Sequence, residues 1–321
     1  MKKISIIIPL YNLEKLIGKC IASALAQDLP SGEYEVLVID DGSTDGSLAA
    51  AQDAAQGHPH VKVYSKPNEG LSRTRNYGMD RAAGKYVMYL DADDYLEPDV
   101  LGRLADTMER ERLDMLCFDI AGVDESGADC PLWSDGLSAI NGTEVQSGCD
   151  FLCRDRFLPM TCTYLYNREM LDHNGLRMTP IGHEDEEFTP RALYFAKRIK
   201  YLPLRVYNYL QRTDSFMGNY NPAGRLDLIR AMKSLTDFAS RIEKVDPVGA
   251  RLMRLHIGRT TYLTCKQTIL SRLGDAREML RFARQQGVIP LSFRRSRFQH
   301  FMINHTPSLF VLYYRLHKRR R

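Results

Sequence analysis

The fold is decided by the stretch Lys85–Asp94, which reads Lys-Tyr-Val-Met-Tyr-Leu-Asp-Ala-Asp-Asp. Its first part, Lys85–Leu90, is mostly apolar and predicts a buried strand of a sheet that is covered on both faces. Acidic side chains follow at once, so this strand ends in a cluster of carboxylates. A buried strand that delivers polar groups at its carboxyl end is typical of ligand-binding α/β proteins.

Strands and helices alternate on both sides of this stretch. The other predicted strands are Ile4–Pro9, Glu35–Asp40 and Val61–Tyr64. Apolar residues spaced three and four apart predict a helix over residues 13–25. A second helix is predicted after the turn of residues 41–46 and ends at Gln56, and a third covers residues 71–83 with Gly84 just past its end. Pro98 suits the first position of the next helix. The alternation predicts an α/β fold with a Rossmann-like, mainly parallel central sheet flanked by helices.

Further along the chain, the pattern changes from mixed strands and helices to helices alone. Residues 113–118 predict a fifth strand, and residues 119–148 carry no readable pattern. Residues 163–166 then predict a strand, residues 167–173 a short helix and residues 184–196 an amphipathic helix. Asn219–Gly224 indicates a boundary, and helices are predicted over residues 225–244, 248–272 and 275–286. We therefore expect a first domain over residues 1–218 and a helical C-terminal region with a basic tail over residues 219–321.

The composition is that of an ordinary globular protein, with 44% hydrophobic and 26% charged residues among 321. No apolar run approaches the roughly 18 residues that cross a bilayer. The short apolar start ends at Pro9 and lacks the features of an export signal. The 7 cysteines are scattered and form no Cys-x-x-Cys pair, so we expect buried, reduced thiols and a cytoplasmic location.

The sharpest chemical signal is the pair Asp91 and Asp93. In an extended segment, residues two apart point to the same side, so both carboxylates can face one site. Hard divalent cations prefer oxygen ligands, and Mg²⁺ is usually held by one or two carboxylates together with substrate phosphates. The alternative is a solvated turn that caps the next helix, but the position at the end of a buried strand favours a metal site.

Two more polar clusters are predicted at strand ends. Asp40 closes an apolar run, where an acidic side chain can accept hydrogen bonds from a base or a ribose, while Thr44 or Asp45 would cap the following helix. Residues 68–72 form a polar turn at a helix start that offers N–H groups to an anion. Arg75, one turn further on, would reach a phosphate, or form a surface salt bridge instead.

Five motifs in this order resemble those of family 2 glycosyltransferases. They are Pro9-x-Tyr11-Asn12, residues 38–45, Asn68-x-Gly70-x-Ser72-x-x-Arg75-Asn76-x-Gly78, Gly84-Lys85-Tyr86 and Leu90-Asp91-Ala92-Asp93-Asp94. The resemblance covers residues 1–120 and, less closely, residues 160–215. It implies a GT-A fold in which residues 1–120 form the nucleotide-binding half and residues 160–215 the half that carries the base and meets the acceptor.

The resemblance also implies roles for single residues. Residues that match Pro9, Tyr11 and Asp40 contact the uridine, and those that match Asp91 and Asp93 serve ribose, diphosphate and a metal, Mn²⁺ or Mg²⁺. Arg212, in the segment Tyr209-x-x-Arg212-x-x-Ser215, is expected near the diphosphate. The whole expected donor-binding set is Pro9, Tyr11, Asn12, Asp40, Asn68, Gly70, Arg75, Asp91, Ala92 and Arg212, with Asp93 and Asp91 as metal ligands.

An acidic cluster runs over residues 184–187 at the start of a predicted helix. Acidic residues there gain from the helix dipole, so capping is one interpretation. The resemblance implies instead that Asp185 is the catalytic base, with Glu184 as the alternative. Such a weak base acts only as charge develops in the transition state. One base, one metal and no evident nucleophile imply a single displacement that inverts the anomeric centre.

The expected reaction moves a hexose or an N-acetylhexosamine from a UDP-sugar to a hydroxyl group of a saccharide or a lipid-linked saccharide, in cell-surface or capsular polysaccharide or glycolipid biosynthesis. No nucleic-acid partner is expected. A nucleotidyltransferase would need a Gly-rich, basic first loop, and residues 10–14 are not that. A dehydrogenase would need a GxGxxG motif after the first strand. A non-catalytic subunit that binds nucleotide sugars is disfavoured by the acidic cluster.

The end of the chain joins an apolar, aromatic segment to basic residues. From Met279 onward there is no Asp or Glu, and Pro307–Leu316 is followed by the basic cluster Lys318–Arg321. This combination predicts a helix that lies in a membrane interface, and so a peripheral contact with the anionic inner face of the plasma membrane. Alternatively, Leu309, Leu312 and Leu316 pack on the domain, and the basic end is solvated.

Overall fold

A computed structural model describes residues 2–132, 142–152, 158–212, 222–271, 275–292 and 297–317. The chain divides into two compact units, which are described one at a time. The N-terminal unit comprises Met1–Pro180 and Ala192–Ser215, and the C-terminal unit comprises Ile181–Arg191 and Phe216–Arg321. Residues 181–191 therefore group with the C-terminal helices, although they precede part of the N-terminal unit in the sequence.

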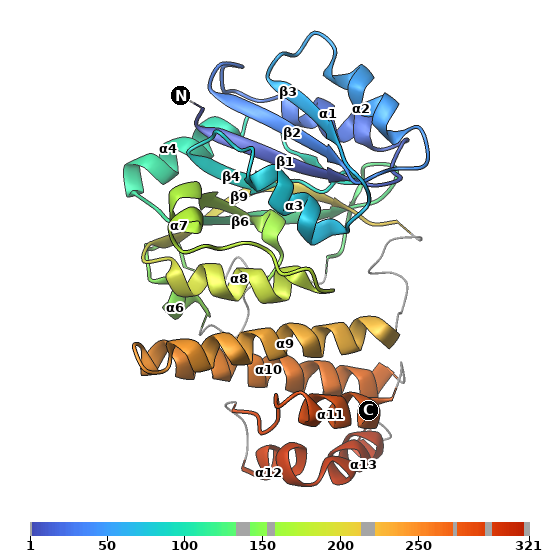
Figure 1. The fold of residues 1–321 in the computed structure, drawn as a ribbon, viewed down its shortest axis with the longest axis vertical. Helices are drawn as coiled ribbons and strands as arrows, with labels where there is room; N and C mark the ends of the chain where they lie inside the picture. The colour runs from blue at the N-terminus through green and yellow to red at the C-terminus, as the bar shows by residue number, and fades with distance from the viewer. Residues whose placement is uncertain are drawn as a thin grey trace. The chain divides into compact units, whose positions relative to one another are not determined.

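The N-terminal unit is built on a twisted mixed sheet with the strand order β3-β2-β1-β4-β8-β6-β9-β5 (Figure 1). The first half of the sheet is parallel and consists of β1 (Ile4–Leu10), β2 (Tyr34–Asp40), β3 (Val61–Ser65) and β4 (Tyr86–Tyr89). These elements confirm the strands predicted from the apolar runs, and the parallel half confirms the predicted arrangement of the sheet.

The second half of the sheet is mixed. It consists of β5 (Tyr95–Leu96), β6 (Met115–Val123), β8 (Tyr164–Asn167) and β9 (Ile199–Leu210), and β7 (Asp129–Cys130) pairs with β6. Strand β8 runs antiparallel to β4 and β6, β5 runs antiparallel to β9, and β6 and β9 are parallel. The sequence pattern predicted β8 but not β9, which places residues 199–210 between β6 and β5.

Helices cover both faces of the parallel strands. Alternate residues of β1, such as Ile6 and Ile8, belong to a core that includes buried residues of α1 (Ile17–Leu25) and α4 (Leu101–Glu111). The intervening residue Ile7 faces α3 (Leu71–Met79), where a Cβ on Gly78 would collide with its side chain. Helix α2 (Ser47–Ala55) packs beside α1. Alternating side chains of a buried strand thus find apolar partners on each side.

Two predicted helix limits in this unit are wrong. The predicted helix over residues 71–83 ends at Met79, and Pro98 is not the first residue of a helix, since α4 begins at Leu101. Gly84 does not cap α3, because its N–H donates to Ser5 Oγ over 2.8 Å, and a Cβ at this position would collide with the backbone of Ser5. The helix ends at Met79, and Gly84 then packs against Ser5 of β1.

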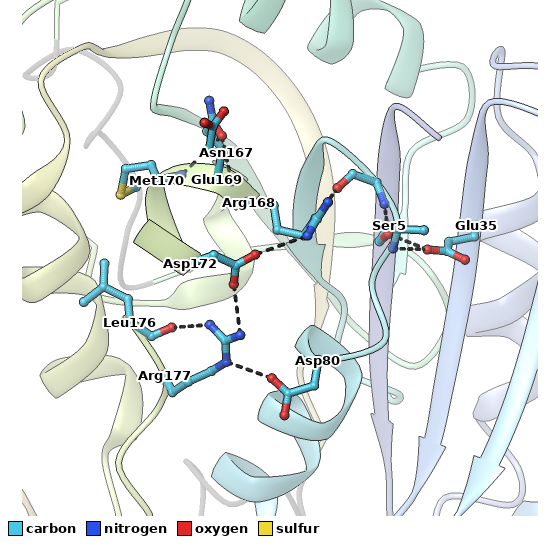
Figure 2. A network of polar contacts seen from close by, with 12 residues as sticks. Ser5, Glu35, Asp80, Asn167, Arg168, Glu169, Met170, Asp172, Leu176 and Arg177 are labelled. Atoms are coloured by element: carbon cyan, nitrogen blue, oxygen red, sulfur yellow. Dashed lines mark hydrogen bonds and ion pairs between the residues drawn. The ribbon is translucent and has the colours of Figure 1, made fainter. Parts of the chain in front are cut away.

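Gly84 is one member of a polar network at the amino end of the sheet (Figure 2). Ser5 Oγ donates to the buried carboxylate of Glu35 over 2.8 Å, and the same carboxylate accepts the Ala83 N–H over 2.7 Å. Arg168, at the start of α7 (Arg168–His173), donates to the Gly84 carbonyl oxygen over 2.7 Å. This network lies at the opposite end of β1 from Leu10 and explains the Gly84-Lys85-Tyr86 motif as a structural one.

The C-terminal unit is helical, and the predicted helices within it are confirmed. They are α9 (Pro222–Ile242), α10 (Pro247–Ser271) and α11 (Ala276–Gln285), and α12 (Arg297–His305) and α13 (Pro307–His317) follow them. Asp275 caps α11, since its side chain accepts the Arg277 N–H. Helix α8 (Glu184–Phe195) starts in this unit, and α6 (Gly148–Leu152) belongs to the N-terminal one. Within the described parts of the chain, no helix has both the length and the apolar character to cross a bilayer.

Candidate active site

The register of the parallel strands gathers the predicted residues at one edge of the sheet. Leu10 lies opposite Asp40 on β2, and Ile7 lies opposite Tyr89 on β4, so Asp91 follows β4 at the height of Pro9. Pro9 is buried in the central strand β1 even though it has no N–H group to donate. This is possible because β4 pairs with β1 only as far as Ile7, which leaves Pro9 a single neighbouring strand.

Asp40 is buried at this edge with both carboxylate oxygens engaged. One accepts the Ser43 N–H over 3.2 Å, and the other accepts the Ser65 hydroxyl over 2.8 Å. Asp45, one of the two predicted caps, accepts the N–H of Ser47, the first residue of α2, over 3.0 Å, while the N-cap position itself is Gly46. Asp40 has a different position from Asp45 and does not cap the helix.

Asn12 joins the loops that follow β1 and β2. Its backbone has a positive φ of 51°, its N–H donates to Ser43 Oγ over 3.0 Å, and its side-chain oxygen accepts the Thr44 N–H over 2.8 Å. The neighbouring Tyr11 is 48% exposed, so its ring is accessible to a ligand at the edge of the sheet. Asn12 therefore links the loop after β1, which carries Tyr11, to the loop after β2.

Asp41 is a further buried carboxylate, to which sequence reasoning assigned no role. It forms an ion pair with Lys66 and accepts the N–H groups of Glu69 and Gly70 over 2.9 and 2.8 Å. Burial alone would raise the pKa of the Asp41 carboxyl, but these donors hold it below its usual value. The turn before α3, expected to offer N–H groups to a bound anion, thus gives two of them to the protein's own carboxylate.

Glycine and asparagine residues of the motifs over residues 38–45 and 68–78 support the loops around this turn. Gly42 has φ 69°, and a Cβ there would come within 2.8 Å of the Asn68 nitrogen, so the loops can approach only because Gly42 has no side chain. Gly70 has φ 87° at the start of α3. The side chain of Asn76 both donates to and accepts from the backbone of Met178, each over 2.8 Å. These positions are explained by the loop geometry they support.

Two of the aspartates that follow β4, Asp91 and Asp93, are each paired with an arginine. Asp91 Oδ1 accepts from Arg75 Nη2, and Asp93 Oδ2 accepts from Arg212 Nη2 over 2.8 Å. Arg75 is only 3% exposed, so its contact with Asp91 is not the surface salt bridge that was the alternative prediction. The side chains of Asp91 and Asp93 keep 30% and 27% of their surface exposed. Both carboxylates are therefore open to a ligand.

Charge at this site is only partly balanced. Burial and the nearby charge of Asp91 raise the pKa of the Asp93 carboxyl, and Arg212 offsets part of the effect. In the stretches of the chain that the structure describes, no group of three or more His, Cys, Asp or Glu residues is arranged to hold a metal ion. Among the described residues at this site, Asp91 and Asp93 are a pair of partly exposed carboxylates.

Strand β9 anchors the loop that carries these aspartates, and sequence reasoning missed this contribution. The Tyr207 hydroxyl donates to Asp94 Oδ2 over 2.6 Å and accepts the Asp91 N–H at 3.2 Å. The Leu210 N–H donates to the other oxygen of Asp94 over 2.8 Å. Asp94 is buried, and burial together with the charges of its acidic neighbours raises the pKa of its carboxyl well above the usual value.

The predicted catalytic pair lies in the C-terminal unit. Glu184 and Asp185 are half-buried in the first turn of α8, and Asp185 Oδ1 accepts the Glu186 N–H over 2.8 Å. Burial and the charge of Asp185 raise the pKa of Glu186 to about 8. Glu187 is fully engaged, since it accepts from Arg191 and from Ser234 of α9 over 2.6 and 2.8 Å. Within the acidic cluster, Glu187 has a structural role, and the base assigned to Asp185 stays a prediction.

Comparison with known proteins agrees with this architecture. Residues 5–158 match the sequence profile of glycosyl transferase family 2. An uncharacterized glycosyltransferase of Bacillus subtilis, EpsJ, is 30% identical over 224 residues, which are 68% of this chain and 64% of that protein. The poly(ribitol-phosphate) beta-N-acetylglucosaminyltransferase TarS of Staphylococcus aureus is 27% identical over 67% of this chain and 36% of its own length.

A solved structure extends the likeness to nearly the whole chain. The crystal structure of S. aureus TarS 1-349 in complex with UDP-GlcNAc superposes with a TM-score of 0.75 at 22% identity, covering 99% of this chain and 90% of that one. The fold is therefore the GT-A fold with a helical C-terminal extension, and the chain belongs to glycosyl transferase family 2. The chain spans 64% and 61% of the length of the first two curated relatives that it matches.

Proposed function

We propose that this protein is an inverting glycosyltransferase that moves a hexose or an N-acetylhexosamine from a UDP-sugar to a hydroxyl acceptor. The observation that carries the proposal is the set of acidic residues at one edge of the parallel strands: Asp40 on β2 and Asp91 and Asp93 after β4, with Arg75 and Arg212 beside them. Ligands of open α/β sheets bind beyond the carboxyl ends of the strands, where these residues lie.

Donor binding divides between the two sides of this edge. The exposed ring of Tyr11 and the buried Asp40 would receive the uridine, and the arginines would attract the diphosphate. Both arginines are already paired with aspartates, so the diphosphate would share an existing charged network rather than meet free cations. TarS, which has the same fold, has been crystallised with UDP-GlcNAc, and this supports a UDP-sugar as the donor.

The acidic edge also fits a divalent metal ion, Mn²⁺ or Mg²⁺. The carboxylates of Asp91 and Asp93 are both partly exposed here, and hard cations bind carboxylate oxygens of this kind. Asp93 and Asp91 would hold the ion, and phosphate oxygens and water would complete its shell. When bound, the ion supplies positive charge that stabilises the departing nucleoside diphosphate.

The acceptor hydroxyl needs a base, and we assign this role to Asp185, with Glu184 as the alternative. A carboxylate takes the proton as the oxygen attacks the anomeric carbon, while the bond to the diphosphate breaks on the opposite side. A single displacement of this kind forms no covalent enzyme intermediate and inverts the configuration. Both residues are only half-buried in the first turn of α8, so a substrate can approach them.

For the acceptor, we propose a saccharide or a lipid-linked saccharide of a cell-surface polymer. TarS and a Bacillus spizizenii relative, 26% identical over 79% of this chain and 39% of its own length, are named as transferases acting on poly(ribitol-phosphate). A polymer made at the inner face of the plasma membrane would also account for a peripheral location. The basic cluster Lys318–Arg321, which we expected to bind anionic lipid, lies outside the described residues.

A transfer assay tests the proposal directly. The purified chain is incubated with Mn²⁺, a saccharide acceptor panel and UDP-GlcNAc, UDP-glucose or UDP-galactose, and the release of UDP and the anomeric configuration of the product are measured. We expect acceptor-dependent release of UDP that EDTA suppresses, and a product of inverted configuration. Retention of configuration would contradict the mechanism, and turnover with a GDP-sugar but with no UDP-sugar would contradict the assigned donor.

A further inference from the structure

The outer face of α13 is apolar, where a surface helix is usually polar. Phe310, Val311 and Tyr314 are buried and hold the helix in place. The three leucines that were expected, in one interpretation, to pack on the domain do not do so: Leu309, Leu312 and Leu316 are 41%, 50% and 53% exposed. Their spacing of three and four residues places them on one side of the helix.

Helix α12 extends this surface. Phe298 and Phe301 are 53% and 52% exposed, while the following Met302 and Ile303 are buried. The ring of Phe298 lies 5.8 Å from that of Tyr313, which sits four residues after Leu309 on α13. The two helices thus share one exposed apolar surface, the α12–α13 face, which consists of Phe298, Phe301, Leu309, Leu312 and Leu316.

The charge around this face has a single sign. Arg297 and Arg315 are exposed on the same two helices, and the sequence from residue 279 to residue 321 contains no Asp or Glu. Exposed apolar rings and leucines on helices that carry basic but no acidic side chains are the pattern of a helix surface that lies in the interface of an anionic bilayer. A second copy of the chain would bring two positively charged surfaces together, which disfavours a symmetric dimer through this face.

We infer that the α12–α13 face binds an anionic membrane by inserting its rings and leucines into the boundary between headgroups and acyl chains. The arginines remain at the level of the lipid phosphates, where the anionic headgroups attract them. The inference rests on the proposed function for its purpose, which is to keep the enzyme beside a lipid-linked acceptor. It extends the tail prediction, which placed residues 307–321 at the membrane, because it adds Phe298 and Phe301 of α12 to the contact.

Co-sedimentation with vesicles tests the inference on the full chain. We expect binding to vesicles of phosphatidylcholine with about one third phosphatidylglycerol, little binding to pure phosphatidylcholine, and weaker binding as NaCl is raised. The double variant Leu312→Ser/Leu316→Ser should bind the anionic vesicles about tenfold more weakly or worse. The matched control is Val245→Ser/Val248→Ser, which removes two apolar side chains that are 82% and 67% exposed elsewhere in the same unit, and it should bind like the unmodified chain.

Two further measurements separate the possible failures. Hydrogen exchange of the unmodified chain should show residues 298–316 protected by anionic vesicles, a result that needs no variant to fold. Calorimetric UDP affinity should be the same in the leucine variant and in the unmodified chain, so a loss of donor binding would point to the proposed function or to misfolding rather than to lipid. Equal binding of anionic vesicles by the leucine variant and the valine control would overturn the inference. So would an unmodified chain that does not bind vesicles and instead forms a dimer that the leucine variant abolishes.

Discussion

Tyr207 holds the acidic loop of the site from a strand that lies more than 100 residues further along the chain. Its hydroxyl bridges the Asp94 carboxylate and the Asp91 N–H, over 2.6 and 3.2 Å. Removing the hydroxyl in Tyr207→Phe leaves a buried carboxylate with one donor fewer, at a cost of about 1–3 kcal/mol in the free energy of unfolding. Because Asp91 and Asp93 lie on the same loop, UDP affinity in the presence of Mn²⁺, measured by calorimetry, should fall as well.

The control for this variant is Tyr201→Phe on the same strand. Tyr201 donates to Asp119 over 2.6 Å, away from the acidic loop. The Tyr201→Phe variant should lose a similar free energy of unfolding, and its affinity for UDP should not change. Equal UDP affinity in both variants would show that Tyr207 stabilises the fold without positioning the site.

Single residues were predictable from the sequence where their chemistry matched a local pattern. Asp40, Asp91 and Asp93 follow apolar runs, and the structure places all three at the same edge of the sheet. The partners of Asp41 and Asp94 could not be predicted, because Lys66 and Tyr207 are distant in sequence and carry no local signal of the pairing. Sequence patterns predict which strand end carries a group, but not which distant donor holds it.

Among the elements, the turn that precedes β4 leaves no room for an added methyl group. A Cβ at Gly84 would collide with the backbone of Ser5, which cannot move aside as a flexible side chain can. We expect Gly84→Ala to lower the free energy of unfolding by about 1–3 kcal/mol or more, as measured by urea denaturation. Gly18→Ala in α1 is the control, because nothing lies within 4 Å of the added Cβ, and alanine there should stabilise the helix by about 0.5–1 kcal/mol.

The same network makes the stability of the sheet depend on pH through Glu35. Burial alone would raise the pKa of this carboxyl, but its donors, the Ala83 N–H, Ser5 and Lys62, bring it below its ordinary value of 4.5. A carboxyl whose pKa is lower in the folded state stabilises the fold above its unfolded pKa and loses this contribution as the pH falls through the folded pKa.

The stability difference between the unmodified chain and Glu35→Gln should therefore be largest near neutral pH and shrink below about pH 4.5. Urea denaturation across this pH range measures it. Glu33→Gln serves as the control, since its ion pair with Lys3 is 39% exposed on both sides and contributes little. A difference that grows on acidification would contradict the assignment of Glu35 as an ionised, hydrogen-bonded group.

Elements with strong periodicity were predictable, and those defined by the rest of the sheet were not. The apolar runs gave β1 to β4, and helical spacing gave α9, α10 and α11. Strand β9 escaped prediction because it is irregular: it contains Pro203, and its register against β6 shifts at residues 118–120. The end of α3 was placed too late because the signal that stops it is the docking of Gly84 on Ser5, a contact across the fold.

At the scale of the whole molecule, the proposed donor-binding residues Asp40, Asp91 and Asp93 belong to the N-terminal unit, and the proposed base Asp185 belongs to the C-terminal one. Asp185→Asn should keep its UDP affinity and lose about 10²–10⁴ in transfer rate, because it removes a group that acts only in the transition state. If Glu184→Gln is the inactive variant instead, the base is its neighbour, and if both variants remain active, the acidic cluster only caps α8.

The central claim is that the acidic edge of the parallel strands binds the diphosphate of a UDP-sugar with a divalent ion. Calorimetric titration of UDP into the unmodified chain and into Asp93→Ala, each with Mn²⁺ and with EDTA, tests this most directly. Asp93 lies in the turn after β4, and its side chain is 27% exposed, so the variant should fold normally. The account predicts that Mn²⁺ strengthens UDP binding in the unmodified chain and has no such effect in the variant. Undiminished metal-dependent UDP affinity in Asp93→Ala would contradict it.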